Sequence, residues 1–104
     1  MADGVGDRFR VVHHPVVRSC WRGWRTQAAQ VGLLGEFLAA LRRVEWRLTH
    51  EPVDWGEPFH DLRGLHMIQR RAVEWFFLLT YAVNEEERFV YLQNVQLLPN
   101  NPLE

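Results

Sequence analysis

The chain has 104 residues, of which 47% are hydrophobic and 24% charged, and its formal net charge is −1. This length suits a single domain, residues 1–104, that buries a core without metals or disulfides, and the composition is that of a globular protein. The near-neutral charge excludes a protein that coats nucleic acid through bulk charge, because nonspecific affinity comes mainly from phosphate neutralisation. Every cationic side chain is arginine, so a mechanism that needs lysine is also excluded.

Two further features bear on the location of the protein. Its single cysteine, Cys20, allows no internal disulfide and fits a reducing cytosol. No stretch reaches the roughly 18 apolar residues that span a bilayer, and no apolar run of signal-peptide length opens the chain. We therefore expect a soluble, cytoplasmic protein with no membrane partner.

The first half of the chain predicts one strand and two helices. Residues 8–12 alternate polar and apolar side chains before Pro15, as a short strand does. Apolar residues then recur at helical spacing, with Gly32 between the two runs. The first run is Val17, Cys20, Trp21, Trp24, Ala28 and Val31, and the second is Leu34, Phe37, Leu38, Leu41, Val44 and Leu48. The short connection predicts an antiparallel helical hairpin whose apolar stripes need cover.

The second half predicts a sheet. Residues 50–65 hold two prolines and two glycines among acids and predict an irregular loop. The segments 66–73, 76–83 and 89–98 are rich in Val, Phe, Leu and Tyr, as in a three-stranded antiparallel meander with turns at 74–75 and 84–88. The expected fold is α+β, with an N-terminal strand, a helical hairpin, and helices packed on one face of a small curved antiparallel sheet.

Four strings, taken in order, resemble the RelE/ParE superfamily of bacterial type II toxins. They are "FRVVHHP", "LLGEFLAALRRVEWRLTHEP", "GEPFHDLRGL" and "LLTYAVNEEERFVYLQNVQLLP", and they cover most of the chain from Phe9 to Pro99. The resemblance implies a toxin that is neutralised by an antitoxin protein. RelE-like members cleave messenger RNA on the ribosome, whereas ParE-like members are associated with inhibition of DNA gyrase.

The sequence departs from the nuclease pattern of this family at several positions. Met67 and Gln69 replace charged residues, and Leu78 in "FLLTY" stands where the resemblance implies an arginine facing the scissile phosphate. Near the C-terminus, Asn100 and Asn101 cannot act as general acids or bases. Whether the chain is an mRNA endoribonuclease is therefore left open at this point.

Five side chains remain candidates for catalysis: Arg70, Arg71, His66, Glu74 and Tyr81. Arg70 and Arg71 can supply positive charge, but neighbouring strand residues point to opposite faces, so at most one can face a shared site. His66, Glu74 and Tyr81, with Tyr91, are the available acid or base groups. The alternative is that these arginines are solvated and that the others are hydrogen-bonded structural groups.

Other patterns also have two interpretations. Arg18, Arg22 and Arg25 on the first helix, and Arg43 and Arg47 on the second, form either a binding face or a solvated face. The five histidines show no metal-binding spacing, so we expect neither a metal nor a cofactor. Trp46, Trp55 and Trp75 lie off the apolar stripes, either on a partner surface or under the long loop.

Two functions follow from these observations. The first is a toxin-like protein of a type II toxin–antitoxin module, either intact or degenerate. It binds an antitoxin and acts on ribosome-bound messenger RNA or on DNA gyrase. The second is a catalytically inactive protein-interaction module that keeps the RelE/ParE-like fold.

Overall fold

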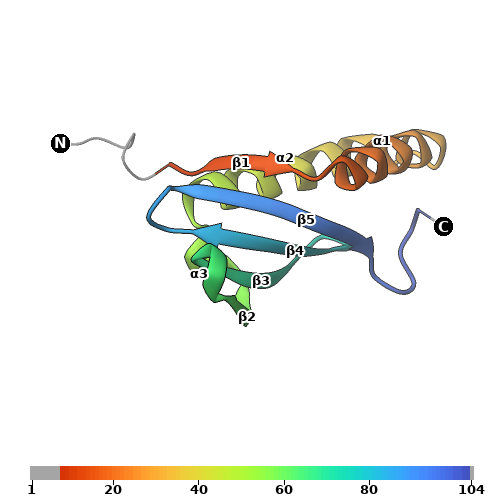
Figure 1. The fold of residues 1–104 in the computed structure, drawn as a ribbon. Helices are drawn as coiled ribbons and strands as arrows, with labels where there is room; N and C mark the ends of the chain where they lie inside the picture. Colours follow the sequence, from red (N-terminus) through yellow and green to blue (C-terminus); the bar gives the residue numbers. More distant parts are fainter. Residues whose placement is uncertain (1–7, 104) are drawn as a thin grey trace.

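The computed structural model describes residues 8–103 and has the α+β fold that the sequence predicts (Figure 1). Its elements in chain order are β1 (Arg10–His13), α1 (Pro15–Gln30), α2 (Leu34–His50), α3 (Pro52–Trp55), β2 (Glu57–Leu62), the short 3-10 helix η2 (Arg63–Leu65), β3 (Met67–Glu74), β4 (Phe77–Asn84) and β5 (Phe89–Leu97). The predicted order of strand, helical hairpin and meander is confirmed.

The strands form one sheet in the order β1-β5-β4-β3-β2, which runs from top to bottom in Figure 1. β1 pairs in parallel with β5, and every other neighbouring pair is antiparallel. The meander strands start and end within one residue of the predicted bounds. The β3–β4 hairpin turns through Trp75 and Phe76, and Trp75 takes a φ of 57°, which glycine more commonly supplies in such turns.

The prediction of an irregular loop over residues 50–65 was wrong, because this segment contains α3, β2 and η2. Pro52 is the first residue of α3, a position where no backbone N–H is needed. Pro58 lies in β2, which is an edge strand, and edge strands tolerate proline. The register also shifts between Pro58 and His60, so that Phe59 is left in a bulge.

The helices α1 and α2 pack on one face of the sheet and bury the apolar stripes that the sequence predicts. Their buried residues are Val17, Trp21 and Ala28 in α1, and Phe37, Ala40, Val44 and Leu48 in α2. Phe77 of β4 lies at the centre of an aromatic cluster, with ring centroids 4.9 Å from Trp21 and 5.3 Å from Trp75. Val31 is an exception: it is 51% exposed because α1 ends one residue before it.

Strand alternation divides the sheet into two faces. Phe77, Leu79, Tyr81 and Val83 of β4 belong to the buried core under the helices, and α3 joins this side because Trp55 stacks on Tyr81. The intervening residues of β4, and their cross-strand partners, form the opposite side, which we call the open face. Within residues 8–103 no helix covers the open face, and none is both long and apolar enough to cross a membrane.

Candidate functional site

Tyr81 is a buried residue of the helix-covered face. Its hydroxyl donates a hydrogen bond to the Pro52 carbonyl oxygen at 2.7 Å and accepts one from the Gly56 N–H at 2.8 Å. Its ring stacks on Trp55 with centroids 5.9 Å apart, and none of its surface is exposed. Burial raises the pKa of Tyr81 to about 12, against the opposing effects of the Gly56 hydrogen bond and the Arg70 charge. These contacts keep the phenol protonated and away from any substrate.

Arg70 lies next to Tyr81 because the two residues are paired across β3 and β4. Its Nη1 donates to the Gly56 carbonyl oxygen at 2.8 Å, while its Nε is buried and has no hydrogen-bond partner. Tyr81 therefore binds the N–H of Gly56, and Arg70 binds its carbonyl oxygen. Of the five candidates, these two are brought together, and what they bind is the protein's own backbone.

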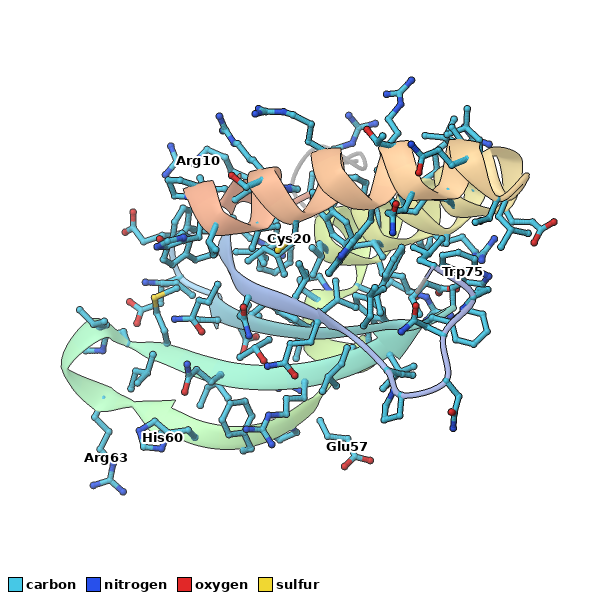
Figure 2. The ribbon with its side chains drawn as sticks, turned by 90° about the vertical axis from the view of Figure 1, so that its right-hand side faces the viewer. Arg10, Cys20, Glu57, His60, Arg63 and Trp75 are labelled. Carbon is cyan, nitrogen blue, oxygen red and sulfur yellow. The ribbon has the colours of Figure 1, made fainter. Side chains whose placement is uncertain are left out.

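Glu74 and His66 lie at opposite ends of β3. Glu74 accepts from Nε of Arg43 at 2.7 Å and ties the sheet to α2, with only 15% of its side chain exposed. His66 is exposed and has a left-handed backbone conformation just after η2. The seven residue steps of β3, from Met67 to Glu74, span about 23 Å, so His66 and Glu74 do not share a site. Figure 2 labels Arg63 of η2, which precedes β3, and Trp75, which follows β3, on opposite sides of the view.

Arg71 is the one candidate that lies on the open face within β3. It pairs with Thr80, whereas Arg70 pairs with the core residue Tyr81, so the two arginines point to opposite faces as strand alternation predicts. The Arg71 guanidinium carbon lies 4.2 Å from the centre of the Phe59 ring. This cation–π contact holds an exposed positive charge beside an exposed aromatic ring.

A second arginine–aromatic pair lies on the open face at the far edge of the sheet. The guanidinium of Arg10 in β1 lies 5.2 Å from the centre of the Phe89 ring in β5. Phe89 in turn stacks on Tyr91 with centroids 6.5 Å apart. Three strand spacings, about 14 Å, separate β1 from β3 across the sheet.

Polar side chains fill the open face between the two pairs. Gln69 donates to Gln93 at 2.7 Å, which bridges β3 and β5 over the smaller Ala82 between them. Thr80 and Asn94 belong to this strip, and Gln96 lies beyond it beside Leu78. His60 of β2 is paired with Gln69 and so belongs to the same face.

Several open-face residues were missed by sequence reasoning. Phe59 and His60 were assigned to a loop, because β2 shows no buried alternation that would predict a strand. The signal for a strand was weak: it consisted of the aromatic Phe59 next to Pro58. Arg10 and Phe89 were missed because the parallel pairing of β1 with β5 joins distant parts of the sequence.

Two residues that depart from the family's nuclease pattern, Leu78 and Asn101, have clear places in the structure. Leu78 is half-buried on the open face, between Val73 and Gln96. Asn101 is buried, with its side chain donating to the Leu98 carbonyl oxygen and accepting from the Leu103 N–H. Asn101 therefore shapes the C-terminal turn.

The remaining polar candidates have structural contacts. Arg47 of α2 contacts Glu51 at 3.1 Å, and its guanidinium lies over the Trp55 ring. His14 caps α1 by accepting from the Val16 N–H at 3.0 Å, and His13 contacts Glu45 at 2.8 Å. Among residues 8–103 no three His, Cys, Asp or Glu side chains are grouped so as to hold a metal ion.

The chemistry available to the open face is binding. Guanidinium groups suit phosphates, and aromatic rings suit bases, so the face can hold an anionic ligand with flat groups. Arg70, Glu74 and Tyr81 belong to the other face, where they hold the fold together. Comparison of the chain with protein-family models, with curated proteins and with solved structures found no match.

Proposed function

We propose that this chain is a toxin-like protein of a bacterial type II toxin–antitoxin module and that the open face is the surface that engages its target. The observation that carries the proposal is the pair of arginine–aromatic contacts, Arg71 with Phe59 and Arg10 with Phe89, on a sheet face that no described helix covers. The strings that resemble the RelE/ParE superfamily, and the strand–helix–helix–meander order, support the same proposal.

The chemistry of the open face favours the ribosome-bound message over DNA gyrase as the target. A single RNA strand offers phosphates to guanidinium groups and unstacked bases to aromatic rings. The polar strip between the pairs adds hydrogen-bond donors and acceptors without adding charge. An antitoxin would neutralise the protein by covering this face or an adjacent sheet edge.

Binding without cleavage is the mode of inhibition that we propose. Cleavage would need an acid and a base beside the phosphate that Arg71 holds. Glu74 is engaged by Arg43 and Tyr81 by Pro52 and Gly56, both on the helix-covered side. A message bound to the open face therefore meets Arg71 without either of these groups. The titratable side chains beside Arg71 on that face are Glu57, which is paired with Arg71, and His60, which is paired with Gln69.

A second candidate is a catalytically silent protein-interaction module. Leu78 favours it, since an apolar side chain lies on the open face where the family resemblance implies a phosphate-facing arginine. In that case the partner of the open face would be a protein surface, and no nucleic acid would bind.

Induction of the protein in a bacterial host distinguishes these functions. Growth arrest with intact messages and blocked protein synthesis is the expected result. Arrest with cut messages would indicate a RelE-type endoribonuclease, and arrest with relaxed plasmid DNA would indicate gyrase inhibition. Unchanged growth, with the protein present in folded form, would reject the toxin function and leave the interaction module. Co-expression of a small protein encoded beside this chain tests for the antitoxin, which should restore growth.

A further inference from the structure

Two glutamine side chains meet over the centre of the open face. Gln69 of β3 donates to the side-chain oxygen of Gln93 in β5 at 2.7 Å, so the bond spans the strand between them, β4. Ala82 of β4 is paired with Gln69 and has no exposed surface, although no described helix covers this face. We call the two glutamine side chains the amide bridge, and they form part of the cover over Ala82.

The amide bridge leaves hydrogen-bonding groups available to a ligand. An amide nitrogen carries two hydrogens, and an amide oxygen accepts two hydrogen bonds. The bridge uses one hydrogen of Gln69 and one lone pair of Gln93, and neither side chain makes another hydrogen bond within residues 8–103. Both side chains are only partly buried, so a ligand on the open face can donate to the Gln69 oxygen and accept from the remaining amide hydrogens.

The amide bridge lies between the two arginines of the arginine–aromatic pairs. In the register of the sheet Arg71 is level with Thr80 of β4, and Arg10 is level with Asn84. Ala82 is midway between these two positions of β4, so a line from one arginine to the other runs diagonally over the bridge. The line crosses three strand spacings, about 14 Å, and runs about 13 Å along the strands. A nucleic-acid strand whose phosphates meet both guanidinium groups therefore passes over the two amides.

Both arginines are free to bind phosphates. Each guanidinium lies over an aromatic ring, 4.2 Å from the ring centre for Arg71 and 5.2 Å for Arg10, and both residues are exposed. Neither arginine forms an ion pair with another residue of the described chain. Glu57 is paired with Arg71 in the sheet but forms no ion pair with it. The charge of the two guanidinium groups thus complements the phosphates of a bound strand.

We propose that the amide bridge is a subsite that reads one base of a bound RNA strand and that this base is adenine. The exocyclic amine of adenine has a ring nitrogen on either side, so both edges of the base offer a donor beside an acceptor. A glutamine amide pairs with such an edge through its oxygen and one of its hydrogens. Cytosine offers this pattern on one edge alone, guanine has a carbonyl oxygen in place of that amine, and uracil has no amine. The inference rests on the proposed function, because it names what the open face recognises in a message.

Binding of short RNA strands to the purified protein tests the subsite. Fluorescence anisotropy compares two labelled strands of equal length, one of adenosine and one of dimethyladenosine, in which methyl groups replace both hydrogens of the exocyclic amine. The two strands carry the same phosphates and the same ring system, so they differ in the donor that the Gln69 oxygen would accept. We expect the wild type to bind the adenosine strand about tenfold more tightly, which is within the discrimination that one bidentate amide contact gives.

Substitution of the glutamines assigns the preference to the amide bridge. Gln69→Met and Gln93→Met each remove one amide at similar side-chain size, and both variants should bind the two strands with equal affinity. Gln96→Met is the matched control, because Gln96 lies in β5 on the same face, beside Leu78 and outside the bridge. This control should keep the preference of the wild type. Circular dichroism checks that all three variants are folded.

The outcomes separate this inference from the proposed function. Equal binding of the two strands by the wild type would overturn the subsite and leave the proposed function standing, since the open face would still bind RNA. A preference for adenosine that survives in both Gln69→Met and Gln93→Met would also overturn it, because another group would then read the base. A wild type that binds neither strand would overturn the subsite as well, and growth after induction tests the proposed function independently of that result.

Discussion

The Gly56 N–H donates a hydrogen bond to the Tyr81 hydroxyl at 2.8 Å, across 25 residues of sequence. The same hydroxyl donates to the Pro52 carbonyl oxygen at 2.7 Å, so one side chain of β4 binds both ends of the α3 segment. Arg70 binds the Gly56 carbonyl oxygen at 2.8 Å. This network fixes the start of β2, and β2 carries Phe59 and His60 onto the open face.

Replacement of Tyr81 by phenylalanine tests the network. Tyr81→Phe leaves the Pro52 carbonyl and the Gly56 N–H buried without a partner, and we expect a loss of about 1–3 kcal/mol in the free energy of unfolding. Urea denaturation measures the loss. Tyr91→Phe is the matched control and should change stability by less than about 0.5 kcal/mol. Equal stability of the two variants would contradict a structural role for the Tyr81 hydroxyl.

The pH dependence of stability gives an independent measure of the same residue. The pKa of Tyr81 rises from 10.0 to about 12 on folding, so the folded state keeps a proton that the unfolded state loses. The contribution of Tyr81 to the free energy of unfolding is therefore fully present below pH 10. It falls as the pH rises towards 12, by about 1.4 kcal/mol per pH unit. Wild-type protein should lose more stability than Tyr81→Phe in this range. Parallel curves for the two proteins would show that Tyr81 ionises normally.

Gly56 should tolerate no side chain. A Cβ at this position would lie 2.5 Å from the Tyr81 hydroxyl oxygen and 2.9 Å from the Arg71 carbonyl oxygen. We expect Gly56→Ala to cost about 1–3 kcal/mol by overpacking, as measured by thermal or urea denaturation. Gly64→Ala is the control, because a Cβ there meets no atom within 4 Å. Unchanged stability of Gly56→Ala would mean that the segment moves freely away from Tyr81.

The contact between Arg43 and Glu74 should stabilise the packing of α2 on the sheet. Their side chains are 52% and 15% exposed and lie 2.7 Å apart, so we expect a coupling energy of about 0.5–1 kcal/mol in a double-mutant cycle to alanine. Arg63 and Asp61 form the control pair, at 3.7 Å and with exposures of 90% and 53%, and should show almost no coupling. A coupling no larger for the first pair than for the second would contradict this role.

The sequence predicts the meander and the helical hairpin well because both depend on local patterns. Apolar residues at helical spacing become the buried faces of α1 and α2, and the runs rich in Val, Phe and Leu become β3, β4 and β5. β2 lacks such a pattern, since most of its side chains are exposed on an edge strand. Its conformation depends on pairing with β3, which no local signal in the sequence reveals.

The arrangement of the candidate site could be predicted only in part from the sequence. Strand alternation correctly separates Arg70 from Arg71. The burial of Tyr81 depends on Pro52 and Gly56, which are distant in sequence and sit in a segment predicted to be a loop. The placement of Arg10 on the same face as Arg71 depends on parallel pairing of β1 with β5, which joins the two ends of the chain.

The most direct test of the open face is the growth rate of a bacterial culture after induction of a double variant, Arg10→Ala with Arg71→Ala. Each substitution removes the cation of one arginine–aromatic pair and leaves the buried core unchanged. Arg18→Ala with Arg22→Ala on the exposed side of α1 is the matched control. We expect the wild type and the control to arrest growth. The open-face variant, expressed to the same level, should leave growth unchanged. Arrest of equal strength by the open-face variant would contradict the central claim.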